Sequence, residues 1–541
     1  MRTDVDGVDA LSEPSNDDPI LESPIGHDTT LKRRSAPSRR ELLFKGLFAA
    51  LAATASGCPT GGTPTDPDPD PDPDPDPDPD PDPDPDPVSN EEALLKLVDR
   101  ITFGQNEYEL QLAHSLGYED YLEYHLNYTA IDDSTLDAML APLTTLNMTA
   151  AEIVFSEQQK HYSMYELIAA VILRACYSKR QLFERTVELW TDHFNIYIEK
   201  DGQSFLKPVD DREVIRKFAL ASFPELAWAS AHSPSMLTYL DNDPSSKEAP
   251  NQNYAREYLE LHTLGVDNYT QQDVEEVARC FTGWSVRWDW LSDDFGTFRF
   301  SRWTHDNGEK TVLGRTIPAD GGITDGEFVI NLVTKDPEIS QITARFIAKK
   351  IARHFWGYNP PDALITEIAA AYTATQGDIR AMLRVVLAEK WIAIAPPKLK
   401  RPFHYVVSTF RALDADINSE DALWGILYVL GLMGHVPFDW APPNGYPDAS
   451  AFWSGLLLPR WRFGAIVPLQ GDYLGIDFSP FLADMTTQEF LDLVNARVFR
   501  GAMTDYELSA LQQFIEEHPD WDYRKLETIG LALSSPGFQW Y

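Results

Sequence analysis

The residues best suited to chemistry in this chain lie in one helix-like segment, residues 251–266. Glu257 and Glu260 are three positions apart, which on an α-helix places both carboxylates on one face. Two carboxylates so placed could bind a metal or divide the acid and base roles of a reaction. The structural alternative is that Glu260 pairs with Arg256, four positions before it, while Glu257 caps or pairs with another helix.

The histidine of this segment is not expected to join the carboxylates. His262 follows Glu260 by two positions, which is about 200° around an α-helix, so its ring should point away from them. The Glu-x-x-His arrangement of di-iron proteins fails, because Thr263 occupies the third position after Glu260. A divalent metal therefore remains an open possibility that needs histidines from elsewhere. The candidate ligands are His193, Glu257, Glu260 and His305.

Two other histidines have a functional and a structural interpretation. His193 lies between Trp190 and Phe194 and could also be a core histidine bonded to a backbone carbonyl. His305 and Asp306 could form a base and its orienting carboxylate, or a solvated turn. Four aromatic residues could stack on sugar rings or belong to the core: Tyr239, Tyr254, Tyr258 and Trp284. The candidate catalytic residues are therefore His193, Glu257, Glu260, His262, His305 and Asp306.

The segments that must position these residues have mostly helical patterns. Ser89 and Asn90 are plausible caps of an amphipathic helix that begins at Glu91. Thr270 and Asp273 resemble a capping box, with the helix stopped by a glycine at position 283. Apolar residues at helical spacing also cover residues 165–175, 185–197, 328–332, 342–355 and 365–372.

One stretch departs from the helical pattern. Residues 298–316 alternate on both sides of Asp306-Asn307-Gly308, which predicts a small β-hairpin. The chain has no phosphate-binding glycine loop, no Gly-x-Ser-x-Gly elbow and no His-Glu-x-x-His motif. The predicted fold class is mainly α, a large multi-helix body over residues 88–541 with this hairpin.

The N-terminal 57 residues are typical of an export signal. Arg39 and Arg40 precede an apolar run too short to span a membrane, the pattern of a twin-arginine signal. That route carries folded proteins, often with a bound cofactor. The run ends at small residues before Cys58, which predicts cleavage there and a lipid on that cysteine, although Ala55 stands where leucine is usual.

A spacer separates this cysteine from the helical body. Eleven Asp-Pro dipeptides run from Asp66 to Pro87. Proline fixes φ and favours extended geometry in the residue before it, so residues 58–87 are predicted to contain a stiff rod of about 70 Å at about 3.1 Å per residue. The chain is then anchored to a membrane through the lipid, facing the periplasm or the cell surface.

Charge and cysteines limit the remaining classes. The formal net charge is −39, and no basic patch is evident, so a nucleic-acid partner is not expected. The cysteine spacing matches no metal knuckle or redox pair. Cys176 and Cys280 could form one disulfide, but two buried free thiols are the favoured interpretation.

Several motifs together resemble the bacterial domain of unknown function 1800 family, over residue 93 to the C-terminus. They are Tyr239-Leu240-Asp241-Asn242, Asn253-Tyr254-Ala255-Arg256-Glu257, Glu260-Leu261-His262-Thr263-Leu264-Gly265-Val266, Phe281-Thr282-Gly283-Trp284, His305-Asp306, Gly445-Tyr446-Pro447 and Ser535-Pro536-Gly537-Phe538-Gln539. Gly537 stands where the family often has glutamate. The resemblance implies an exported, mostly helical protein and an exported partner similar to alkaline phosphatases. It implies no activity.

Two hypotheses of different classes follow. In the first, the chain is a non-catalytic or assembly protein that works with an exported partner on cell-surface or extracellular material. In the second, it is a metal-assisted hydrolase that uses Glu257, Glu260, His193 and His305.

Overall fold

The computed structural model describes residues 89–290, 292–517 and 521–541, all within the unit Pro83–Tyr541. The predicted export residues Arg39 and Arg40, the lipid-bearing Cys58 and the Asp-Pro stalk lie outside the described residues and stay predictions. In the described ranges, no helix combines the length and the apolar character that a membrane crossing needs.

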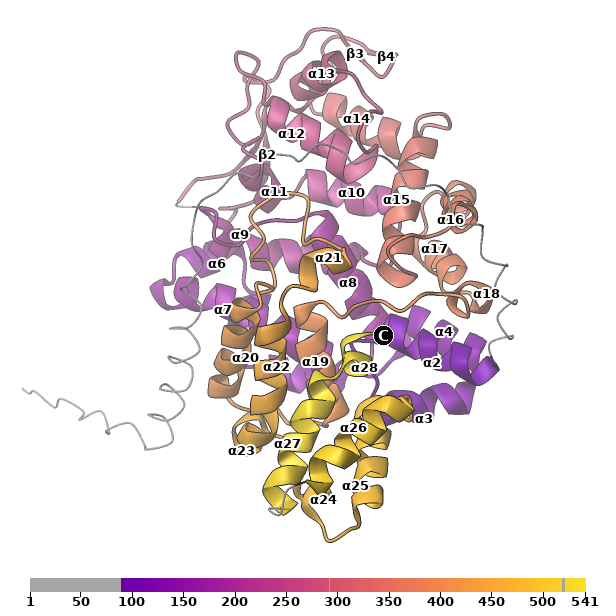
Figure 1. Ribbon diagram of the computed structural model, residues 1–541. Helices are drawn as coiled ribbons and strands as arrows, with labels where there is room; N and C mark the ends of the chain where they lie inside the picture. Colours follow the sequence, from indigo (N-terminus) through magenta and orange to yellow (C-terminus); the bar gives the residue numbers. More distant parts are fainter. Residues whose placement is uncertain (1–88, 291, 518–520) are drawn as a thin grey trace, which may run out of the picture. The chain divides into compact units, whose positions relative to one another are not determined.

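The described residues are mainly helical, which confirms the predicted fold class (Figure 1). The elements before the strands are α2 Asn90–Ile101, α3 Glu107–Leu116, α4 Tyr118–Leu126, η1 Tyr128–Ala130, α5 Ser134–Leu140, η2 Thr144–Asn147, α6 Ala150–Val154, α7 Glu157–Tyr177, α8 Gln181–His193, α9 Gln203–Asp210, η3 Asp211–Arg216, α10 Phe223–Ala231, α11 Pro234–Tyr239, α12 Gln252–Glu257, η4 Tyr258–Thr263 and α13 Gln271–Phe281.

Four short strands and a second series of helices follow. They are β1 Trp284–Val286, β2 Phe298–Phe300, β3 Lys310–Val312, β4 Arg315–Ile317, α14 Thr324–Lys335, α15 Ser340–Phe355, α16 Asp362–Thr375, α17 Ile379–Val386, α18 Glu389–Ile392, α19 Pro402–Ala412, α20 Glu420–Leu432, α21 Ser450–Trp453, α22 Leu457–Ile466, η5 Val467–Gln470, α23 Gly471–Leu474, α24 Ser479–Leu482, α25 Thr487–Val494, η6 Asn495–Phe499, α26 Asp505–Glu516, α27 Trp521–Ser534 and α28 Pro536–Gln539.

The helices of this unit surround two large apolar cores. The first collects buried residues between Leu94 and Ala395, and the second collects residues between Phe103 and Phe538. The chain enters the second core early, through α5 and α7, before α8 returns to the first. Figure 1 shows α10–α17 of the first core in the upper part of the view and α20 and α22–α27 in the lower, with α2–α4 of the first core at the lower right.

The predicted helix starts are confirmed by their caps. The Ser89 hydroxyl accepts from the backbone N–H of Glu92 at 3.2 Å, opening α2. Thr270 and Asp273 form the expected capping box at the start of α13. Gly283 follows that helix with φ 78°, and a Cβ there would lie 2.5 Å from the carbonyl oxygen of Ser301.

One helix ends earlier than its apolar pattern indicates. The pattern over residues 185–197 belongs to α8, which ends at His193. Phe194, Ile196 and Ile198 continue to be buried in the loop that follows, so their apolar spacing did not reveal the helix end. Tyr197 therefore lies in the loop before α9 rather than on α8.

The strands pair differently from the predicted hairpin. β2 pairs with β1, and β3 pairs with β4, so the two arms around Asp306–Gly308 do not pair with each other. The reason is that Arg279 and Lys310 hold the intervening loop. Arg279 donates to the Asp306 carboxylate, and the Lys310 ammonium donates to the Gly308 carbonyl at 2.9 Å. Residues 298–317 thus contribute to two small hairpins.

Among the described residues, three α-helices pass into π-helical turns: α9 into η3, α12 into η4 and α25 into η6. In η4 the backbone N–H of Leu264 donates to the carbonyl of Leu259, five residues earlier, at 2.7 Å. Such turns change the angle between successive side chains. This one lies within the segment that carries the candidate residues.

Cys176 and Cys280 are both buried and free, which confirms the favoured interpretation for the two cysteines. Burial raises the pKa of the Cys176 thiol to about 12. Both side chains act as small apolar residues, Cys176 in the second core and Cys280 in the first.

Candidate functional site

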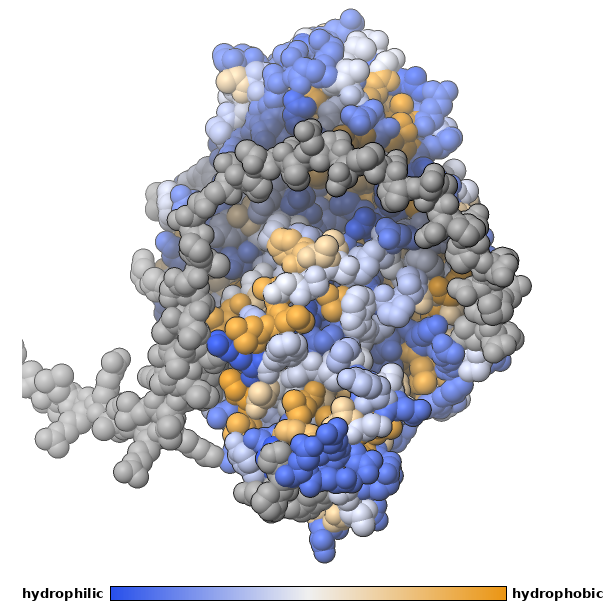
Figure 2. Space-filling view, in the orientation of Figure 1, coloured by the Kyte–Doolittle hydropathy of each residue, from blue (hydrophilic) through white to orange (hydrophobic). Residues whose placement is uncertain are grey.

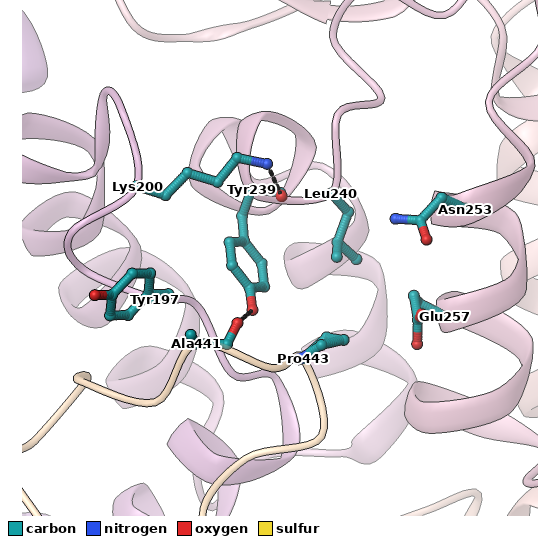
Figure 3. Close-up of a pocket in the computed structure, with 8 residues that line it drawn as sticks. All are labelled: Tyr197, Lys200, Tyr239, Leu240, Asn253, Glu257, Ala441 and Pro443. Carbon is teal, nitrogen blue, oxygen red and sulfur yellow. Dashed lines mark hydrogen bonds between the residues drawn. The ribbon is translucent and has the colours of Figure 1, made fainter. Parts of the chain in front are cut away.

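An open pocket of about 380 Å³ lies where four segments of the body meet. Figure 3 shows Asn253 and Glu257 projecting from α12 on one side, with the Lys200 and Tyr197 side chains opposite. The lining residues are Tyr197, Lys200, Tyr239, Leu240, Asn253, Glu257, Ala441 and Pro443. The pocket therefore combines the α8–α9 loop, the end of α11, α12 and a loop nearly 200 residues away in sequence.

Hydrogen bonds fix the distant loop against the other walls. The Tyr239 hydroxyl donates to the carbonyl of Ala441 at 2.7 Å. The Asn195 side chain donates to the carbonyls of Trp440 and Pro442, each at 2.8 Å. These contacts join residues 440–443 to the loop that follows α8.

Gly445 allows the same loop to approach α8 closely. Its φ is 73°, and a Cβ at this position would lie 2.1 Å from the backbone oxygen of Asp192. Only glycine can occupy this position without moving one of the two backbones. The Gly445-Tyr446-Pro447 motif thus has a defined structural role beside the pocket.

Three polar side chains of the pocket are available to a ligand. In the part of the chain that the structure describes, the side chains of Tyr197, Asn253 and Glu257 form no hydrogen bond with protein. Burial raises the pKa of the half-buried Glu257 carboxyl, and the Glu260 carboxylate raises it further, while Arg256 opposes both. Lys200 differs, because its ammonium donates to Asp241 at 2.7 Å.

The second carboxylate does not line the pocket. Glu260 accepts a short hydrogen bond from the Tyr269 hydroxyl. Arg256 donates to the Gln271 side chain at 2.6 Å, so the expected pair between Arg256 and Glu260 is replaced by contacts to the next helix and its cap. Glu260 acts on Glu257 through its charge alone.

His193 and His262 meet in the first core, away from solvent. Both are at most 2% exposed, and their ring centroids are 6.1 Å apart. His193 Nε2 donates to the backbone carbonyl of His262 at 3.1 Å, which matches the core interpretation of His193. Burial, followed by the nearby Lys350 ammonium, lowers the pKa of His262 to about 3 and that of His193 well below its usual range. Both rings are thus neutral.

His305 belongs to a separate buried cluster. His305, Lys310 and Asp325 are at most 1% exposed. The Asp325 carboxylate accepts from His305 Nε2 at 3.1 Å and from the Lys310 ammonium at 2.7 Å. His305 Nδ1 donates to the carbonyl of Thr282 at 2.7 Å, so the ring joins the end of α13 to Asp325 on α14.

Asp306 does not orient His305. Its carboxylate accepts from Arg279 Nε at 2.8 Å, and this hydrogen bond is the largest influence that lowers the pKa of Asp306. The carboxylate that orients His305 is Asp325, and this pairing was not predicted because Asp325 lies 20 residues later in the chain. The pair His305–Asp306 is thus structural.

The candidate metal ligands do not converge. Glu257 faces the pocket, Glu260 faces Tyr269, His193 lies in the core and His305 lies against Asp325. Within the described residues, no group of three or more His, Cys, Asp or Glu side chains could hold a metal ion. Of the four aromatic residues proposed for sugar stacking, Tyr239 lines the pocket, whereas Tyr254, Tyr258 and Trp284 are at most 1% exposed.

The sequence alone did not identify Tyr197, Lys200, Ala441 or Pro443 as pocket residues. The apolar spacing of residues 185–197 predicts Tyr197 on a helix, and Lys200 lies in no motif. Ala441 and Pro443 lie just before Gly445-Tyr446-Pro447, so that motif was the available indication of the fourth wall.

The comparison with known families agrees with the motifs. A family model described as protein of unknown function (DUF1800) matches residues 96–540, so the chain belongs to this family. No curated protein and no solved structure matches the chain.

Proposed function

For this member of the DUF1800 family, we propose an exported, membrane-anchored protein that binds saccharide chains of cell-surface or extracellular material in the pocket at Glu257. The export signal at Arg39 and Arg40 and the lipid site at Cys58 support its location. The Asp-Pro tract from Asp66 to Pro87 supports a spacer between the proposed lipid site and the helical body.

The observation that carries the proposal is the set of unpaired polar side chains in one open pocket. Tyr197, Asn253 and Glu257 form no hydrogen bond with the described protein, yet all three line the same cavity of about 380 Å³. Polar groups that the fold leaves unpaired at a pocket are the groups that fix a ligand's orientation.

The polar and aromatic side chains that line the pocket favour a saccharide as the ligand. Sugar hydroxyls both donate and accept, so they can donate to the Glu257 carboxylate and pair with the Asn253 amide. Tyr197 and Tyr239 provide aromatic surface for the C–H faces of a sugar ring. The open pocket admits a chain rather than a single enclosed molecule.

Binding of oligosaccharides to the purified full chain tests this function. A panel of neutral and N-acetylated oligosaccharides is titrated calorimetrically against wild type, Glu257→Gln and Asn253→Ala. We expect at least one saturable ligand in wild type and a loss of about tenfold in affinity for each variant, because one hydrogen bond to ligand is removed.

Glu309→Gln is the matched control, since Glu309 is an exposed glutamate outside the pocket. It should retain wild-type affinity. If no saccharide binds, or if Glu257→Gln and Asn253→Ala bind as tightly as wild type, the pocket does not have this function.

The alternative is that the chain hydrolyses its ligand. The raised pKa of Glu257 favours it, because a carboxyl that stays protonated nearer neutral pH can act as a general acid. The metal-assisted form of this hypothesis is supported less, because its four candidate ligands lie apart.

Product analysis separates the two functions. Incubation of the bound oligosaccharide with wild type should leave it intact if the pocket only binds. Appearance of shorter chains that is lost in Glu257→Gln, and that falls as pH rises through the Glu257 pKa, would establish the hydrolase instead.

The anchor has its own test. We expect Cys58→Ser to move the protein from the membrane fraction to the soluble exported fraction, and Arg39→Lys with Arg40→Lys to leave it in the cytoplasm. Membrane association that persists in Cys58→Ser would refute lipidation at that residue.

We also propose that the chain binds an exported partner of the alkaline-phosphatase-like class. Exposed apolar side chains gather on and around α20, α21 and α22, and Figure 2 shows hydrophobic residues on this face. They are Trp424, Phe452, Leu457, Leu458, Trp461 and Leu469. Such a face supports a protein contact. Phe452→Ser with Trp461→Ser should abolish copurification with that partner and leave saccharide binding unchanged.

A further inference from the structure

The charges around the pocket at Glu257 restrict the kind of saccharide that it can bind. The formal net charge of the chain is −39, and only 11 of its 84 acidic residues lie in the Asp-Pro tract. A body this acidic attracts cations and repels anions within about 10 Å of its surface at ordinary salt. The pocket adds carboxylates on two opposite sides, and each side is described in turn.

The first side carries Glu257, on the wall formed by α12. Its half-buried carboxylate accepts no hydrogen bond from the described residues. Burial raises the pKa of this carboxyl, and the charge of Glu260 raises it further. Arg256 opposes this effect only in part, since its guanidinium donates to Gln271 at 2.6 Å. An ammonium group beside Glu257 would offset the repulsion between the two carboxylates, whereas a neutral hydroxyl would not.

The opposite side carries Glu199 and Asp439. Figure 3 shows the Tyr197 ring across the pocket from α12. Desolvation, followed by the charges of Asp439 and Glu199, raises the pKa of the Tyr197 hydroxyl, so both carboxylates lie near this wall. The backbone N–H of Ile198 donates to the carbonyl of Phe438 at 3.0 Å, which brings the two acidic residues together. Neither acidic side chain forms a hydrogen bond or an ion pair with the part of the chain that the structure describes.

The lysine among the lining residues does not balance these charges. The Lys200 ammonium donates to the Asp241 carboxylate at 2.7 Å, so Asp241 already balances its charge. Within the described ranges, Glu257, Glu199 and Asp439 are left without an ion-pair partner. A ligand that supplies positive charge at both sides of the pocket satisfies all three carboxylates.

The aromatic rings of the pocket suit the same kind of ligand. The face of a tyrosine ring attracts an ammonium group, and it also packs against the C–H faces of a sugar ring. The Tyr239 ring already receives the Lys200 ammonium, which lies 5.6 Å from its centre. The Tyr197 ring is therefore the one that remains for a cationic group of the ligand.

We propose that the saccharide bound in this pocket is a chain of amino sugars whose amines are free and carry a proton. One ammonium group lies beside Glu257 and another beside Glu199 and Asp439. Acetylation of the amine removes this charge, and a sugar carboxylate would be repelled from both sides. The inference rests on the saccharide function proposed above, and it names the class of saccharide.

Titration of the purified full chain with three hexasaccharides tests this inference. They are the β-1,4-linked hexamers of glucosamine, of N-acetylglucosamine and of glucose. At pH 6 and low salt, we expect the glucosamine hexamer to bind about tenfold more tightly than the other two, because it alone forms charged contacts. A tenfold rise in ionic strength should weaken binding of the glucosamine hexamer and leave the other two affinities unchanged.

Substitution on each side of the pocket separates local from overall charge. Glu257→Gln and Glu199→Gln should each reduce the preference for the glucosamine hexamer to about threefold, since each removes one of the two charged contacts. Glu309→Gln is the matched control, because it removes the same charge at an exposed position outside the pocket, and it should retain the full preference. An equal reduction in all three variants would mean that the overall charge of the body causes the preference, and would overturn the inference.

Failure of the inference and failure of the proposed function give different results. If all three hexamers bind with equal affinity, the saccharide function stands and the preference for free amines is wrong. If none of them binds, both are wrong. A lysine hexapeptide that binds more tightly than the glucosamine hexamer, and that loses affinity in Glu257→Gln, would show that the pocket recognises cationic peptides instead.

Discussion

At the scale of single residues, the Glu257 carboxylate is expected to destabilise the fold while it contributes to ligand binding. Its pKa is raised above the ordinary value of 4.5 by burial and by Glu260. The folded state therefore disfavours the charged carboxylate, and this cost is present above the folded-state pKa and disappears below the unfolded-state value. We predict that Glu257→Gln raises the free energy of unfolding at pH 7 by about 0.5 kcal/mol, while it weakens ligand binding.

Urea denaturation at pH 7 and at pH 4 measures this effect, and the gain should vanish at the lower pH. Glu309→Gln, at an exposed position, should show no gain at either pH. A Glu257→Gln protein that is less stable than wild type at pH 7 would show that the carboxylate supports the fold rather than a ligand.

Asp325 is predicted to be the most sensitive residue of the hairpin region. Its carboxylate is the shared acceptor for His305 and Lys310 in a cluster that excludes solvent. Asp325→Asn would leave the Lys310 ammonium buried without its counter-charge, so we expect a loss of about 3 kcal/mol in the free energy of unfolding.

The partly exposed pair of Arg279 and Asp306 provides the comparison. Asp306→Asn should cost about 1 kcal/mol or less, because solvent screens that pair. Equal losses in the two variants, measured by chemical denaturation, would contradict the different burial of the two carboxylates.

The sequence could predict part of this residue-scale picture. The core interpretation of His193 followed from its aromatic neighbours and matches its bond to a backbone carbonyl. The separation of His193, Glu257 and His305 could not be predicted, because spacing along the chain gives no distance between elements. Asp325 was missed for the same reason, since its partners are 15 and 20 residues earlier.

At the scale of elements, the loop that carries Ala441 and Pro443 depends on one glycine. Gly445 has φ 73° and lies against the backbone of Asp192, where a Cβ would be 2.1 Å from the oxygen. We predict that Gly445→Ala lowers the free energy of unfolding by about 3 kcal/mol and weakens saccharide binding, because the loop must move away from the pocket.

Gly434→Ala separates the cost of the backbone conformation at residue 445 from the cost of the steric contact with Asp192. Gly434 has a similar φ of 64°, but a Cβ there would meet no atom within 4 Å. It should cost about 1 kcal/mol and leave binding unchanged. Similar losses in the two variants, by denaturation and titration, would mean that backbone conformation alone and not loop contact sets the requirement at residue 445.

Elements with local determinants were predicted well, and elements fixed by distant contacts were not. The capping box of Thr270 and Asp273 spans only four residues, so the sequence alone predicts the start of α13. The π-helical turn η4 has no comparable local motif, and the angles assumed for Glu260 and His262 were those of an α-helix. The strand partners also depended on contacts from Arg279 and Lys310, which the alternation of residues 298–316 does not encode.

At the scale of the whole body, the sequence predicted one mainly helical unit but not its two cores. The apolar pattern marks which residues are buried, and both cores use similar residues. Helices that are neighbours in the sequence can join different cores. α5 and α7 pack in the second core, although α4 before them and α8 after them pack in the first. The last residues of the sequence then return to the middle of the unit. Lys398 and Tyr541 exchange backbone hydrogen bonds at 2.8 and 3.0 Å.

This pairing joins elements from both cores, and Arg460 is its central side chain. Arg460, on α22, is 1% exposed and donates to the Gln539 side chain at 2.8 Å and to the carbonyl of Lys400 at 2.6 Å. On the other side, Arg100 of α2 donates to the carbonyl of Tyr541 at 3.1 Å. We therefore expect both cores to unfold in a single transition. Arg460→Met should cost about 3 kcal/mol, because it leaves two buried acceptors unpaired.

Differential scanning calorimetry measures the coupling directly. Because Arg460 holds residues 539–541 against Lys400, we predict that Arg460→Met splits the single transition into two, with the second core unfolding first. Arg497→Met, at an exposed arginine on η6, should keep one transition at the wild-type temperature. If Arg460→Met lowers the temperature of one undivided transition, the cores are coupled by their broader packing, and residues 398–400 and 539–541 add stability without controlling cooperativity.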